Sequence, residues 1–140
     1  MRHVDDTGSA TLELAILSPV LLLLLGLLIA GGRIEIAKGA VEQATASSAR
    51  EASLARTGTL ASAAATRQAK DSLQQQGVTC TTLRISVGTS GFRAAAGVPA
   101  SVTVDLTCTV PLSDLAVPGM PGSRQLQARI TSPLDTYRAR

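Results

Sequence analysis

With 140 residues and a formal net charge of +3, the chain has room for one modest domain and lacks the dense basic charge of a nucleic-acid-binding protein. Tryptophan is absent, and Phe92 and Tyr137 are the only aromatic residues, which argues against the compact, aromatic-filled core of a soluble enzyme. His3 is the only histidine, and the sequence contains no metal-ligand spacing, phosphate-binding glycine loop or nucleophile–histidine–acid set, so we expect no enzyme activity, metal, cofactor or small-molecule ligand.

The first feature along the chain is an uncharged apolar run, Leu14–Gly32. Nineteen helical residues extend for roughly 28 Å, about the thickness of a bilayer core. Pro19 lies inside the run, a position that membrane helices tolerate better than soluble ones. A signal peptide usually has a shorter apolar core and a more basic leading segment. We therefore predict a retained membrane helix over residues 9–32, with secretion after cleavage near Gly31 as the alternative.

The orientation of this helix is judged from charges and cysteines, which disagree. Arg33 and Lys38 follow the run, and the positive-inside rule read alone would place the C-terminal part in the cytoplasm. Cys80 and Cys108 are the only cysteines, and without a neighbouring histidine they predict a disulfide rather than a zinc site. Because a disulfide implies an oxidising compartment, we favour an extracytoplasmic C-terminal part.

A single glutamate, Glu13, stands at the start of the apolar run, where an unpaired charge is costly. If the chain were cut after Gly8, Ser9 would become the first residue and Glu13 the fifth. In a staggered stack of subunits, the carboxylate of one chain could then meet the new amine of its neighbour and set the register. The alternative is a carboxylate that simply favours the positive end of the helix dipole.

The stretch GSATLELAILSPVLLLLLGLLIAGG resembles the processing region of type IV pilin-like proteins. More narrowly, it looks like the TadE-like family of the tight-adherence (Tad) pilus system, in which G-S-A-x-x-E-x-A-x-x-x-P opens the chain. The C-terminal stretch CTVPLSDLAVPGMPGSRQLQARITSPLDTYR also looks like the end of TadE-like proteins from high-GC Gram-positive bacteria. One departure is that no aromatic residue follows the span in GGRIEIAKG, which leaves the subfamily open.

The resemblance implies a leader, residues 1–8, that prepilin peptidase removes between Gly8 and Ser9. It also implies insertion in the membrane with the C-terminal part outside, and a role as a pseudopilin or minor pilin in pilus assembly. The implied partners are the peptidase, other pilin subunits, the assembly platform and the bilayer. The alternative is an uncleaved single-span anchor that displays a small disulfide-bonded binding domain, for which neither Gly8 nor Glu13 would matter.

Residues 33–76 are predicted to form an alanine-rich helical stalk. One face carries small or apolar side chains at three- and four-residue steps: Ile34, Ala37, Val41, Ala44, Ser48, Ala52 and Ala55. A break is expected near Gly58, with Gly58 ending one helix, Thr59 capping the next and Gly77 closing it. We favour a continuous stalk, packed against other subunits, up to about residue 56. The alternative is that the second helix packs on the protein's own sheet.

Residues 77–140 are predicted to form a small β domain. Alternating apolar residues indicate strands at 78–87, 100–110 and 124–132, separated by loops rich in glycine and proline. An antiparallel three-stranded meander beside a helix makes the fold α+β. Placing Cys80 directly opposite Cys108 puts the apolar residues of the two strands on opposite faces. A bulge, or a disulfide outside the strand pairing, would reconcile the two.

Overall fold

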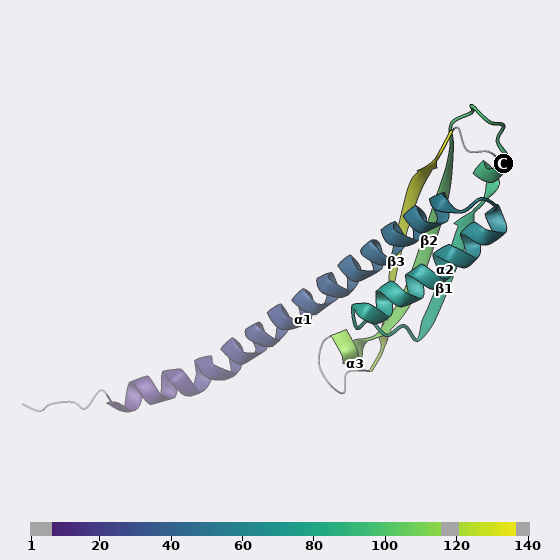
Figure 1. Ribbon diagram of the computed structural model, residues 1–140. Helices are drawn as coiled ribbons and strands as arrows, with labels where there is room; N and C mark the ends of the chain where they lie inside the picture. The colour runs from purple at the N-terminus through teal and green to yellow at the C-terminus, as the bar shows by residue number, and fades with distance from the viewer. Residues whose placement is uncertain (1–6, 116–120, 137–140) are drawn as a thin grey trace, which may run out of the picture.

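The computed structural model describes residues 7–115 and 121–136, with side chains described from Glu13 onwards. A long helix, α1 (Thr7–Leu54), is followed by a shorter one, α2 (Gly58–Gln75). The strands β1 (Thr82–Gly88), β2 (Ala100–Pro111) and β3 (Ser123–Leu134) follow, with the short helices η1 (Ser90–Arg93) and α3 (Leu112–Leu115) between them. Half of α1 extends away from the rest of the chain (Figure 1). The predicted α+β fold, a long N-terminal helix followed by a three-stranded antiparallel sheet, is confirmed.

The second half of α1 packs against α2, β2 and β3. Most members of its predicted apolar face are buried, namely Ala37, Val41, Ala44, Ser48 and Ala52. The buried hydroxyls on this face are satisfied within the helix, since the Oγ of Ser48 donates to the carbonyl of Ala44 at 2.6 Å. Because these side chains are buried within one chain, the face predicted to pack against other subunits is already covered by α2 and the sheet.

The turn between the helices differs from the prediction. Thr57, not Thr59, caps α2, because its Oγ1 accepts a hydrogen bond from the backbone N–H of Leu60 at 3.3 Å. Gly58 opens α2 rather than ending α1. A glycine is favoured there because a Cβ would lie 2.8 Å from the Cβ of Thr89.

Gly77 ends the second helix as predicted, with a φ of +68°. Its N–H donates to the carbonyl of Gln74 at 3.1 Å, and the N–H of Val78 donates to that of Leu73 at 3.0 Å. This pair of bonds is a Schellman motif, which satisfies carbonyls at the end of the helix.

The sheet is an antiparallel meander in the order β1-β2-β3. Its register places Ile85 opposite Leu106 and Leu106 opposite Ala128, so the apolar residues of all three strands share one face. The second and third predicted strands are confirmed to within two residues. The first is shorter than predicted, because residues 78–81 connect α2 to the sheet and β1 begins at Thr82.

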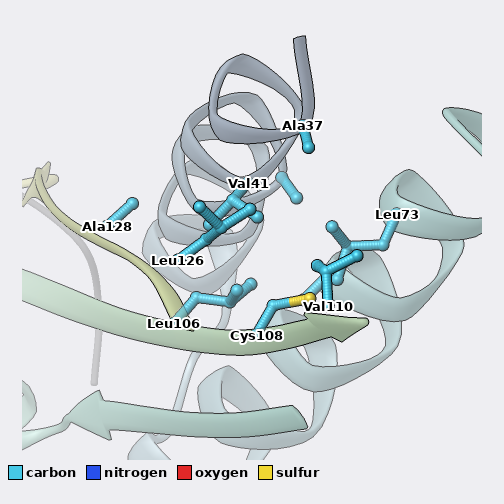
Figure 2. Close-up of a cluster of buried hydrophobic side chains, with 10 residues drawn as sticks. Ala37, Val41, Leu73, Leu106, Cys108, Val110, Leu126 and Ala128 are labelled. Atoms are coloured by element: carbon cyan, nitrogen blue, oxygen red, sulfur yellow. The ribbon is translucent and has the colours of Figure 1, made fainter. Parts of the chain in front are cut away.

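The core lies between the apolar face of the sheet and the two helices, and Figure 2 shows its side chains meeting there. Leu106, Val41, Val102 and Val104 are the largest apolar side chains that are fully buried, and alanine lines both helices. The other face of the sheet is polar: Arg129 forms a bidentate ion pair with Asp105, which raises the pKa of the guanidinium. The core is therefore thin, as the scarcity of aromatic residues predicts.

The predicted disulfide joins Cys80 to Cys108, with the Cα atoms 5.4 Å apart. Cys80 precedes β1 and has no partner in the strand pairing, whereas Cys108 is fully buried in β2 opposite Leu83. The bond therefore lies outside the ladder, which resolves the conflict between the cysteines and the apolar faces. It ties the connection between α2 and β1 to the central strand.

Candidate functional site on the N-terminal helix

The N-terminal half of α1 is an apolar rod with no covering from the described chain. Every described side chain from Glu13 to Ile29 is exposed. The leucine, isoleucine and valine side chains in this stretch are 53–74% exposed, although they are the residue types most often buried. A continuous exposed apolar surface of this size marks contact with a membrane or another protein.

The dimensions of this rod suit a bilayer. α1 is long and apolar enough to cross a membrane. Its uncharged part, Leu14–Gly32, forms about 28 Å of helix, close to the roughly 30 Å of a bilayer core. Pro19 lies within α1 without ending it. The uncovered apolar helix therefore indicates a membrane anchor at the N-terminal end of the molecule.

The predicted processing and register residues lie together at the start of this rod. Gly8 and Ser9 belong to the backbone of the first turn of α1, and Glu13 follows about one turn later with an exposed side chain. The first six residues of the predicted leader lie outside the described residues. An amine created at Ser9 would lie about 6 Å along the axis from Glu13, at the same end of the rod.

The apolar run carries no charge between these groups and the sheet domain, which comprises α2, the strands β1–β3 and the part of α1 that packs against them. Glu13 is the last charged residue before the run, and Arg33 is the next. A carboxylate at this position is costly to place in a bilayer or bundle unless a cation meets it. The arrangement can therefore hold a carboxylate for pairing with an amine of another subunit, while the apolar rod supplies the surrounding contact.

The disulfide lies apart from this group, within the sheet domain. The structure thus separates the predicted residues into two sets. Gly8, Ser9 and Glu13 lie at the start of the rod, whereas Cys108 belongs to the core cluster that includes Ala37 and Val41 of α1, and Cys80 packs against that cluster. One feature that the sequence did not indicate is Ile36, which is 74% exposed just beyond the apolar run. Its neighbours Arg33 and Ala37 help to line a shallow hollow against the end of α2.

Comparison with known protein families gives a match to the rod and the first part of the packed helix. Residues 8–50 match the model of the family described as TadE-like protein. The match begins at the predicted processing glycine and includes Glu13, Pro19 and the whole apolar run. Neither a curated protein nor a solved structure matches the chain. The N-terminal part of the chain, residues 8–50, is thus similar to the TadE-like family.

Proposed function

We propose that the chain is a pseudopilin or minor pilin of a Tad-type pilus that takes part in pilus assembly. Prepilin peptidase removes residues 1–8, and the apolar part of α1 holds the mature chain in the cell membrane. The observation that carries the proposal is the uncovered apolar helix with Glu13 at its start. The family model for TadE-like proteins matches this segment from Gly8 onwards.

The carboxylate of Glu13 gives the proposal its assembly step. Cleavage before Ser9 creates a positively charged amine one helical turn from Glu13. When subunits stack with a stagger along their helices, the carboxylate of one meets the amine of the next. In the low dielectric between packed apolar helices an unpaired charge is costly, so a pairing that satisfies both charges is selected over other registers.

The disulfide supports placing the sheet domain outside the cytoplasm. Cytosolic thiols are kept reduced, whereas disulfides persist in oxidising compartments. With Cys80 bonded to Cys108, the domain of α2 and the sheet suits the extracytoplasmic side. The short N-terminal end would then face the cytoplasm until the peptidase removes the leader.

The proposal is tested by a pair of glycine variants in the native host. Gly8→Ala should leave the chain at full length, because the resemblance implies a peptidase that has room for only a hydrogen at this position. Gly31→Ala is the matched control, since a Cβ there meets nothing within 4 Å. It should be shortened like the natural chain. Full-length chains that begin at Met1 in both variants and in the natural protein would contradict the proposal and favour the uncleaved membrane anchor.

A further inference from the structure

One end of the sheet domain lies level with the first turns of α1 beyond the apolar run. The hollow beside Ile36 is lined by Arg33 and Ala37 of α1, by residues 76–79 just after α2, and by Val110 of β2 and Asp114 of α3. On another side, Ile34, Glu35 and Lys38 line a second hollow with Arg124 and Gln125 of β3. We call residues 33–38, 76–79, 110–114 and 124–125 the proximal end. Figure 1 shows α3 and the end of α2 lying where α1 leaves the domain.

No linker separates the apolar run from the packed part of α1. The run ends at Gly32, the helix continues without a break, and Ile34 already packs against the core. The domain is therefore fixed to the rod at a set height. Residues 33–38 cover about 8 Å of helix, and each headgroup layer of a bilayer is about 5–7 Å thick. With the run in a bilayer core, the proximal end lies in the headgroup layer.

The surface of the proximal end suits this position. Ile36 is 74% exposed, as much as Leu23 inside the run, and an isoleucine gains from contact with acyl chains at the edge of the headgroups. Arg33, Lys38 and Arg124 are exposed and have long stems, which allow their charges to reach lipid phosphates. Glu35 and Asp114 nearly balance these charges, so the span and not attraction to anionic lipid sets the height.

We propose that the proximal end of the sheet domain rests on lipid headgroups while the subunit is in the membrane, with Ile36 at the boundary with the acyl chains. The inference rests on the membrane insertion in the proposed function. The domain thus contacts the lipid surface through elements that lie far from the apolar run in sequence. Its opposite end, with Leu60 at the start of α2, faces away from the bilayer.

The test uses tryptophan fluorescence, because the natural chain contains no tryptophan. Three full-length variants are placed in phosphatidylcholine vesicles: Thr79→Trp at the proximal end, Leu60→Trp at the opposite end and Leu23→Trp in the run. Thr79 and Leu60 are both exposed, so neither change disturbs the core. Lipids with a nitroxide on the headgroup should quench most of the Thr79→Trp fluorescence and leave that of Leu60→Trp unchanged. Leu60 lies roughly 30 Å above the headgroup layer.

Lipids brominated in the middle of the acyl chains should quench Leu23→Trp, which reports insertion itself. If Leu23→Trp is quenched but headgroup nitroxides do not quench Thr79→Trp, the proposed contact of the proximal end with lipid headgroups is refuted, whereas the membrane anchor is not. Absence of both would overturn both proposals. Because the span sets the height, adding phosphatidylglycerol should not alter the ratio of Thr79→Trp to Leu60→Trp quenching. A ratio that rises with anionic lipid would contradict a height set by the span and would indicate electrostatic attraction of the proximal end to the lipid.

Discussion

At the scale of single residues, the proposed function makes assembly depend on the carboxylate of Glu13. Glu13→Gln removes the carboxylate and leaves the amine of a neighbouring Ser9 without its partner. Breaking a buried pair in this way costs about 3–5 kcal/mol, so the fraction of the chain recovered in sheared surface filaments should fall at least about tenfold. Removal of the leader should continue. Glu35→Gln serves as the control, because it removes an exposed carboxylate that lies beyond the apolar run. This variant should assemble normally.

Gly58 lies so close to Thr89 that a larger residue does not fit, and a substitution tests this directly. In Gly58→Ala the new Cβ meets the Cβ of Thr89 at 2.8 Å, so unfolding should become easier by about 1–3 kcal/mol. Gly39→Ala lies in α1 with nothing within 4 Å and should stabilise the chain by about 0.5–1 kcal/mol. Thermal unfolding of both proteins in detergent measures the difference. A stability of Gly58→Ala equal to or above that of the natural chain would contradict the contact with Thr89.

The same turn shows why caps are hard to predict from a sequence. Thr57 and Thr59 are equally good cap residues, and Gly58 suits either the end of one helix or the start of the next. The choice depends on the packing of Gly58 against Thr89, which is distant in the chain. Gly77 could be predicted because the helix end and the positive φ are local features. The exposure of Ile36 could not, because it depends on where α2 and α3 end.

At the scale of elements, the disulfide stabilises the connection between α2 and β1. The bond closes a loop with a sequence separation of 28, and loop-closure entropy predicts a contribution of about 3–4 kcal/mol. Cys108→Ser should destabilise more than Cys80→Ser, because the new hydroxyl at 108 is fully buried while position 80 is only partly buried. Chemical denaturation of the two variants checks the order. Equal losses would indicate that only the covalent constraint matters.

The sheet shows which parts of an element the sequence can predict. The alternation of Leu83, Ile85 and Val87 correctly predicted the buried face of β1, because a sheet with one buried face fixes its register. The predicted start of β1 is wrong because residues 78–81, although rich in β-branched side chains, connect the end of α2 to the sheet. The apolar face of α1 was predicted correctly, but periodicity alone did not reveal that α2 and the sheet cover it.

At the scale of the whole molecule, the rod contributes nothing to the core of the domain. The described side chains from Glu13 to Ile29 are exposed, and packing of α1 against the core begins at Ile34. A chain that starts at Arg33 should therefore be soluble without detergent and unfold cooperatively, with the disulfide formed. Circular dichroism and sedimentation measure both properties. Aggregation or loss of the cooperative transition would show that the rod is part of the folding unit.

The N-terminus of the mature chain decides whether the molecule is a processed pilin-like subunit, as proposed. The measurement is mass spectrometry of the membrane-extracted protein from the native host with its peptidase intact. We expect a chain that begins at Ser9, whose new amine can pair with Glu13 of a neighbouring subunit. A chain that begins at Met1 would contradict the proposed processing and indicate a single-span display protein, and one that begins just after Gly31 would indicate a secreted protein.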